Sequence, residues 1–164
     1  MSVAIDIEQL LAYSDHERAK WMTWIDAAPS LLAVPFQPGG RFPTIGGLLD
    51  HVFLVERRHL ARLEGSTPPD STGVAAGDSR ALFEYANLVR ADLRHYVADM
   101  DDAEAASTLP ITVASGSFTM TRRTLTAHIV LHEIRHLGQL AFAVRLAGHE
   151  PPGEHDFFYF GRLA

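Results

Sequence analysis

The chain contains no cysteine among its 164 residues. Disulfide bonds, thiolate metal ligands and a cysteine nucleophile are therefore excluded, and any thiol in its chemistry must come from another molecule. Basic residues are few, 14 against 20 acidic ones, and they form no stripe, which argues against a nucleic-acid-binding surface. The chain has no run of about 18 apolar residues that could span a membrane, and its start lacks the basic segment of a secretory signal. We therefore expect a cytoplasmic protein with no nucleic-acid or membrane partner.

What the chain does contain is typical of one globular domain, with 47% hydrophobic and 21% charged residues over positions 1–164. Apolar periodicity predicts four helices, over about residues 5–27, 44–65, 78–100 and 121–147. Thr44 and Asp78 are expected as N-caps, and Gly65 and Gly148 as the ends of two helices. Apolar residues at period two around Ser115 and the following glycine predict a short β-hairpin over residues 111–120. The pattern predicts an all-α four-helix bundle with a hairpin before the last helix.

Three histidines follow one another at four-residue intervals in the last predicted helix: His128, His132 and His136. Four residues turn an α-helix through about 400°, so these side chains lie on one stripe about one turn apart. Neutral imidazole is the commonest protein ligand for borderline divalent metals, and a pair at i and i+4 reaches one ion from a single helix. His132 and His136 therefore predict a metal site. His128, one turn further, is expected either as a ligand or as a group that supports one.

Two histidines leave such a metal short of ligands, so another helix must contribute. His51 is the best candidate, because it lies mid-helix in an apolar context, where a bare imidazole needs a partner. Leu48 and Val55 share its face, which indicates that this face points inward. The alternative is a core histidine bonded to a backbone carbonyl. Gln139 lies on the histidine stripe of the last helix and, like His128, is a candidate for orienting a ligand.

The segment from His132 to His136 also reads HExxH, the pattern of metallopeptidases in which the glutamate is the general base. The longer form of that motif requires glycine and histidine where this chain has Gln139 and Phe142. The other common form takes a glutamate ligand from a later helix, and little chain follows His136. Glu133 lies about 100° from His132 around the helix and need not face the metal. A metallopeptidase is therefore the weaker alternative.

The remaining histidines lie in less informative surroundings. His59 is placed among arginines of the second predicted helix and is expected in solvent. His16 and His95 have charged neighbours typical of the surface. His149 and His155 follow the last helix and could approach the mouth of a pocket.

The last predicted helix has a second apolar side, opposite the histidines, made of Val130, Ile134, Leu137 and Ala141. A helix of a four-helix bundle buries one stripe in the core, so a second stripe needs another cover. That cover could be the aromatic segment 157–160 or a second subunit. Two-fold pairing is the commonest way to bury such a face, so we expect a homodimer.

Two segments of the chain resemble the DinB-like superfamily. The second predicted helix has that superfamily's Ser/Thr-led start, mid-helix histidine and following glutamate, in TIGGLLDHVFLVERRHLARLEG. The last helix has its histidine ladder, Gly-Gln pair and closing Gly-x-x-Pro-Pro, in TRRTLTAHIVLHEIRHLGQLAFAVRLAGHEPP. The resemblance implies a four-helix bundle, often dimeric, with zinc or nickel bound by His51, His132 and His136. His128 matches a family histidine that is not usually a ligand. Leu137 stands where many members have arginine before the Gly-Gln pair, which puts any role of that arginine in doubt here.

The resemblance also implies a function. Some relatives are thiol-dependent transferases or isomerases that use a low-molecular-weight thiol, so our leading hypothesis is a metal-dependent transferase or hydrolase acting on a small molecule. Arg41 is one charged loop residue that could bind such a thiol, and the sequence identifies no catalytic residue. The competing hypothesis is a non-catalytic, metal- or ligand-binding stress-response protein.

Overall fold

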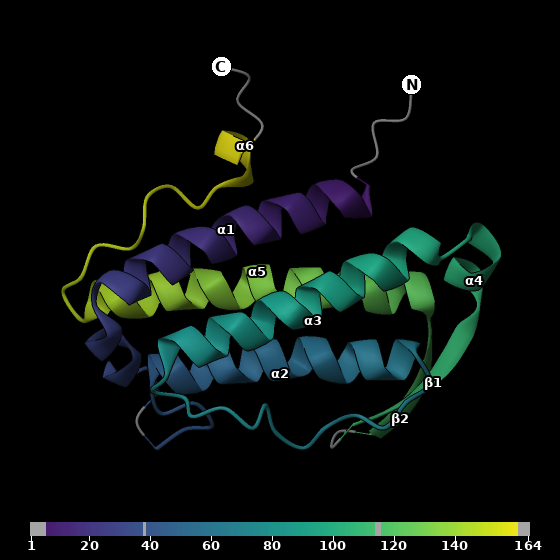
Figure 1. Cartoon of the computed structure of the whole chain (residues 1–164), viewed down its shortest axis with the longest axis horizontal. Helices are drawn as coiled ribbons and strands as arrows, with labels where there is room; N and C mark the ends of the chain where they lie inside the picture. Colours follow the sequence, from purple (N-terminus) through teal and green to yellow (C-terminus); the bar gives the residue numbers. More distant parts are fainter. Residues whose placement is uncertain (1–5, 38, 114–115, 161–164) are drawn as a thin grey trace.

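The computed structural model describes residues 6–37, 39–113 and 116–160 (Figure 1). Its long helices are α1 (Ile7–Ala27), α2 (Ile45–Leu63), α3 (Ser79–Asp99) and α5 (Arg122–Leu146). The shorter elements are the 3-10 helix η1 (Pro29–Ala33), α4 (Asp102–Ala106), α6 (Phe157–Phe160) and the strands β1 (Thr108–Val113) and β2 (Gly116–Thr121). The predicted all-α bundle with a hairpin before its last long helix is confirmed. None of the described helices is long and apolar enough to cross a lipid bilayer.

Side-chain caps fix where the long helices begin. Thr44 accepts a hydrogen bond from the backbone N–H of Gly47, and Asp78 accepts one from Ala81. Each cap satisfies one of the N–H groups that the first helical turn leaves free, as the sequence predicted. Just after α2, Gly65 has a φ of 72°, a left-handed conformation that costs glycine nothing and turns the chain out of the helix.

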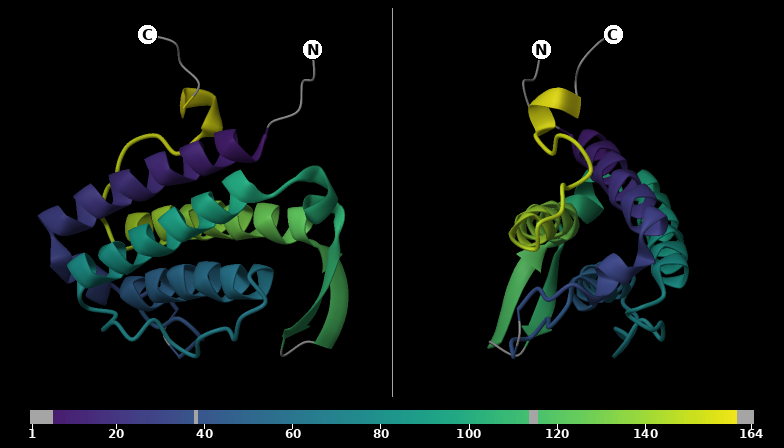
Figure 2. Two further views of the ribbon diagram at one scale, coloured as in Figure 1. Left: turned by 45° about the vertical axis from the view of Figure 1, so that its right-hand side comes forward. Right: turned by 90° about the vertical axis from the view of Figure 1, so that its left-hand side faces the viewer.

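The long helices form a ring in which α2 packs against α3 and α5, and α1 packs against the same two helices. α2 and α3 run in one direction, while α1 and α5 run in the other (Figure 1). The connection from α2 to α3, residues 64–78, therefore returns along the length of the bundle. Figure 2 shows the hairpin projecting at one end, next to the start of α5.

Apolar side chains from all four long helices fill the interior. Trp21 of α1, Phe53 of α2, Leu82 of α3 and Leu140 of α5 belong to one buried cluster. A second cluster, nearer the hairpin, includes Leu11, Leu60, Leu93, Ile111 and Val130. Burying each large apolar side chain contributes about 1.5–3 kcal/mol, so this interior is the main source of stability.

The second apolar side of α5 is part of this interior. Val130, Leu137 and Ala141 are 0%, 5% and 4% exposed, and Ile134 packs partly buried against the cluster near the hairpin. The prediction that this side needs a cover from outside the bundle is wrong, because α5 has a neighbour on two sides, α1 and α2. The aromatic tail does not supply the cover either, since Phe157 packs against Tyr13 of α1 with ring centroids 5.0 Å apart. The homodimer therefore stays a prediction, but the second apolar side of α5 no longer supports it.

The hairpin is longer than predicted. β1 and β2 pair antiparallel from Thr108 opposite Thr121 to Val113 opposite Gly116. Along β1, alternate residues are buried and exposed, as expected for a strand with one face on the core. The predicted turn residue Ser115 lies outside the described residues.

Four charged side chains, one from each long helix, form a buried network. Arg18 of α1 binds Glu56 of α2 and Glu133 of α5, with N–O distances of 2.5 and 2.7 Å. Arg90 of α3 binds the same two carboxylates, at 2.6 and 2.5 Å. All four side chains are 5% exposed or less. Because a buried charge is costly without a partner, this two-plus, two-minus arrangement holds the helices in one relative position.

Candidate metal centre

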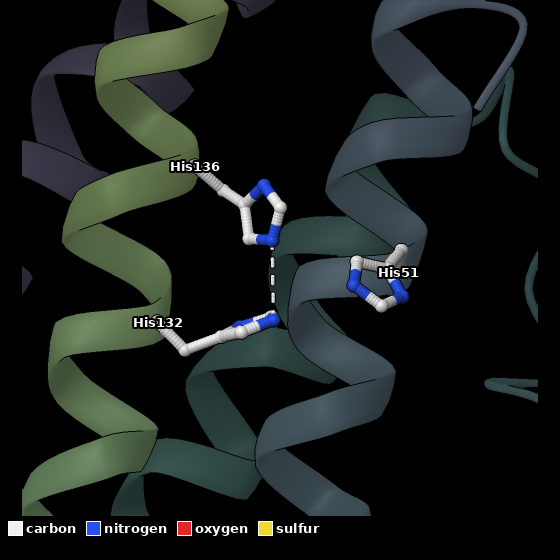
Figure 3. Close-up of side chains that lie close together, drawn as sticks. All are labelled: His51, His132 and His136. Atoms are coloured by element: carbon white, nitrogen blue, oxygen red, sulfur yellow. Dashed lines mark hydrogen bonds between the residues drawn. The ribbon is translucent and has the colours of Figure 1, made fainter. Parts of the chain in front are cut away.

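His51 of α2 and His132 and His136 of α5 point toward one another from adjoining helices (Figure 3). One ring nitrogen of each histidine lies within 4.8 Å of those of the other two. The Nε2 atoms of His132 and His136 are 3.1 Å apart. The structure thus brings together the three histidines that the sequence selected as ligands.

The side chains of this histidine cluster fit a divalent first-row metal ion. Two nitrogens that bind one tetrahedral zinc ion at about 2.0–2.1 Å lie roughly 3.3 Å from each other. The Nε2 atoms of His132 and His136 are already close to that separation. A donor set of imidazoles suits zinc or nickel, whereas magnesium and calcium prefer oxygen ligands.

Gln139 orients one of the three rings. Its side-chain oxygen lies 2.6 Å from Nδ1 of His136. An amide oxygen can only accept a hydrogen bond, so Nδ1 carries the proton and Nε2 is left with a free lone pair. Gln139 therefore fixes the tautomer and the direction of the His136 ring. Residues that support the ligands of metal sites commonly have this role.

The surroundings keep the cluster uncharged near neutral pH. Burial lowers the pKa of His51 to about 4, and interactions with His136, Arg41 and Arg58 act in the same direction. Burial and the neighbouring imidazoles lower the pKa of His132 to about 3. The pKa of His136 is lowered as well, chiefly by burial. Neutral imidazoles are the form that binds metal ions, so the cluster is ready to coordinate at pH 7.

A loop of residues 35–44 covers one side of the cluster. Its two ends are tied together, because the backbone N–H of Phe36 donates to the carbonyl of Pro43 over 3.0 Å. The ring of Phe42 packs on His51, with centroids 4.3 Å apart, and meets His136 edge-on at 6.3 Å. The loop therefore shields the imidazoles from water on this side.

A cavity of about 730 Å³ opens beside His136. One wall comes from the 35–44 loop and the other from α5. Its polar groups are Gln37, Arg135, His136 and Gln139, and its apolar lining is Pro35, Phe36, Phe42, Phe142, Ala143, Leu146 and Ala147. A small molecule with an apolar body can thus lie against one edge of the histidine cluster.

His59 is not in solvent, and this prediction is wrong. It is 9% exposed, and its ring lies 5.2 Å from that of His128. The ring of His128 in turn lies 5.6 Å from that of His132. The two histidines extend the row beyond the cluster, but neither belongs to the group whose ligand atoms converge.

The glutamate of the HExxH pattern does not face the cluster. Glu133 is buried in the charge network, where Arg18 and Arg90 bind its carboxylate and the Ser14 hydroxyl donates to it over 2.5 Å. Burial alone would raise the pKa of Glu133, but the two arginines outweigh it and lower the pKa to about 2. Such a carboxylate is neither placed nor basic enough to activate a metal-bound water. The geometry opposes a metallopeptidase mechanism.

The histidines after α5 lie elsewhere. Nδ1 of His155 is 2.6 Å from Glu17, and its ring stacks on Trp21 at 5.3 Å. His149 meets Trp24 at 6.4 Å. Both belong to the surroundings of α1, so the expectation that they approach the pocket mouth is wrong. His16 and His95 are exposed, as expected.

Together, the fold and the cluster define a class of protein: a four-helix bundle in which two long helices supply a three-histidine candidate metal site. The profile of the DinB family matches residues 1–160, and the chain belongs to this family. The resemblance seen in the sequence is thereby confirmed. No curated protein sequence matches the chain.

Proposed function

We propose that this protein is a metal-dependent enzyme that uses a low-molecular-weight thiol, or water, to modify a small molecule. The observation that carries the proposal is the convergence of His51, His132 and His136 beside a cavity of about 730 Å³. Membership of the DinB family supports it. Three protein ligands leave a coordination position for an exogenous group, the usual arrangement of a catalytic rather than a structural metal site.

Zinc or nickel is the ion that we propose for this site. A bound ion of this kind lowers the pKa of a thiol or water, so that the nucleophile exists near neutral pH. In the thiol reaction, the sulfur bonds to an electrophilic carbon, and the thiol proton and the leaving group depart as an acid. Because the chain has no cysteine, the thiol is a second substrate.

The residues of the chain supply position and surroundings. Gln139 holds the ring of His136, and Phe42 covers His51. The apolar wall formed by Phe36, Phe142 and Leu146 accepts the body of the electrophile and keeps competing water away from the reacting atoms.

A second candidate function is binding without catalysis. No carboxylate is among the residues that line the cavity in the part of the chain that the structure describes. Glu56 and Glu133, carried by the same helices as the histidines, are committed to the charge network. A stress-response protein that sequesters an ion or a small ligand would need no acid or base.

Elemental analysis after purification without chelators tests the metal. We expect about one equivalent of zinc or nickel per chain, the number that a single His₃ site holds. A chain that contains no metal and takes up none on reconstitution would overturn the proposed function.

Assays of a metal-loaded protein against a panel of thiols and electrophiles separate the two functions. Turnover that disappears in His132→Ala but persists in His95→Ala, a change at an exposed histidine of α3, supports the enzyme. Thermal stabilisation by the same compounds without turnover supports the binding protein.

A further inference from the structure

A second cavity, of about 560 Å³, also adjoins the 35–44 loop. Arg41 of this loop lines the second cavity, whereas the next residue, Phe42, lines the first. The second cavity is bounded by α2 and by the loop that follows α2. Its lining is Arg41, Val55, Arg58, His59, Arg62, Pro68, Pro69, Asp70 and Val113. We name it the basic pocket, after its three arginines.

These arginines differ from most others in the chain. Arginines that form ion pairs with carboxylates within the described residues are Arg18, Arg57, Arg80, Arg90, Arg94, Arg122 and Arg123. In the same part of the chain, no carboxylate lies within ion-pair distance of Arg41, Arg58 or Arg62. In a protein with a net charge of −6, three such guanidinium groups in one cavity are a concentrated positive site.

The protein itself uses these guanidinium groups only in part. Arg58 donates to the backbone carbonyls of Pro69 and Asp70, both over 2.7 Å, which fixes its position. Arg41 lies over the ring of Phe42, with its Cζ 5.3 Å from the centroid. Arg62 approaches Nδ1 of His59 at 3.4 Å, the outer limit of a hydrogen bond. Donors of Arg41 and Arg62 therefore remain for a ligand.

The acidic residues nearby do not neutralise the pocket. Asp70 lines it but forms no ion pair with the three arginines. Asp50, one residue before His51, instead accepts a hydrogen bond from Thr72 over 2.5 Å. Burial is the main cause that lowers the pKa of Arg62, and the charge of Arg58 adds repulsion between the two cations. An anion in the pocket would relieve this repulsion.

The basic pocket also adjoins the histidine cluster. Arg58 and Arg62 lie seven and eleven residues after His51, so a helical wheel places each of them within about 20° of His51. Arg41 lies over the ring of Phe42, and that ring packs on His51 with centroids 4.3 Å apart. One molecule can therefore contact both the pocket and the cluster.

We propose that the basic pocket binds the anionic end, carboxylate or phosphate, of the small molecule whose other end reaches the histidine cluster. The fork of a guanidinium group matches both anions with paired hydrogen bonds. The assignment of this molecule as the co-substrate rests on the proposed function. The binding of anions by Arg41 and Arg62 does not depend on the proposed function.

Titration calorimetry of the full chain with succinate and with inorganic phosphate tests the pocket and distinguishes the two anions. Two charge-assisted contacts predict a dissociation constant of about 1 mM or lower for at least one probe, weaker at higher salt. The double variant Arg41→Gln/Arg62→Gln should bind about tenfold more weakly or not at all. Arg57→Gln is the matched control, because Arg57 lies on the same helix but pairs with Glu64.

Each single variant, Arg41→Gln and Arg62→Gln, repeats the comparison with a smaller perturbation if the double variant does not fold. Wild-type protein that binds neither probe, or variants that bind as well as wild type, would overturn the proposal.

The variant His51→Ala separates this proposal from the proposed function. If the anion sits in the basic pocket, this variant binds the probes as wild type does, although its metal is lost. If binding disappears with the metal, the anion ligates the ion directly and the basic pocket is not its site. A chain that binds anions but never binds metal would refute the proposed function and leave the pocket standing.

Discussion

Glu56 of α2 and Glu133 of α5 are held by the same two arginines, Arg18 and Arg90. These arginines come from α1 and α3, so each carboxylate faces the interior of the bundle. The histidines of α2 and α5 leave the same two helices in another direction and meet beside the 35–44 loop. The charge network thus sets the rotation of both helices, and through it the convergence of the cluster.

Removal of one carboxylate should destabilise the bundle without emptying the metal site. Glu133→Ala leaves two buried guanidinium groups short of a partner, which costs about 3–5 kcal/mol. Urea unfolding measures the loss, and elemental analysis of the folded fraction should still find metal. Glu84→Ala is the control, because Glu84 pairs with Arg80 on the surface, where water screens an ion pair and little stability depends on it. A stable Glu133→Ala protein that loses its metal would instead point to a role of the glutamate at the site.

The three ligands and their neighbours should respond differently to truncation. His51→Ala, His132→Ala and His136→Ala each remove a coordinate bond and should abolish tight metal binding. His128→Ala should only weaken it, by about 10–100-fold at most, because His128 touches a ligand but does not join the cluster. Metal content and competition with a chelator give the comparison. A full site in His51→Ala would show that α2 contributes no ligand.

Gln139 offers a test of ligand orientation. Gln139→Ala removes the acceptor at Nδ1 of His136, so the ring is free to turn or to change tautomer. Metal affinity should fall by about 10–100-fold while the fold is retained. Gln37→Ala, which alters another amide of the same cavity, should leave affinity unchanged. Equal affinities in wild type and Gln139→Ala would mean that the hydrogen bond does not position His136.

Stability without metal should depend on pH through the cluster. The pKa of His51 is about 4 and that of His132 about 3 in the folded chain, against roughly 6.5 for an unfolded histidine. The unfolded chain therefore binds more protons below about pH 6.5. The contribution of these groups is complete above that pH and is lost as the pH falls toward 4 and then 3. Urea midpoints between pH 7 and pH 4 should fall less steeply for His132→Gln than for wild type; equal slopes would contradict this origin.

Much of the fold follows from local patterns. Thr44 and Asp78 cap the helices that they were expected to cap. Buried apolar residues follow one another along α3 at intervals of three or four: Leu82, Ala86, Val89, Leu93 and Val97. The sequence could not show which element covers the side of α5 that carries Leu137. That depends on the ring order of the helices, which is set by packing between segments far apart in the chain.

The candidate site, like the fold, could be predicted from the sequence only in part. His51 stands out because an imidazole in an apolar run needs a partner. Arg58 and Arg62 share its side of the helix, so a wheel could have revealed the basic pocket, but the absence of neutralising carboxylates could not be read from spacing. Glu133 looks catalytic in the motif, and only the positions of Arg18 and Arg90 show that it is structural.

Assembly is the last property to test. We propose a homodimer in which two copies meet through apolar residues of α5 at the edge of the cavity that Phe142 and Leu146 also line, since Leu131, Phe142 and Leu146 are 52%, 63% and 74% exposed. They lie within about 60° of one another around the helix, and self-complementary pairing is the commonest arrangement for such a face. Leu131→Glu should shift the protein toward monomer in light scattering and leave metal content and stability intact. Ile134→Glu should lower stability instead, because Ile134 packs on the core. A wild type that is monomeric at high micromolar concentration would eliminate the dimer.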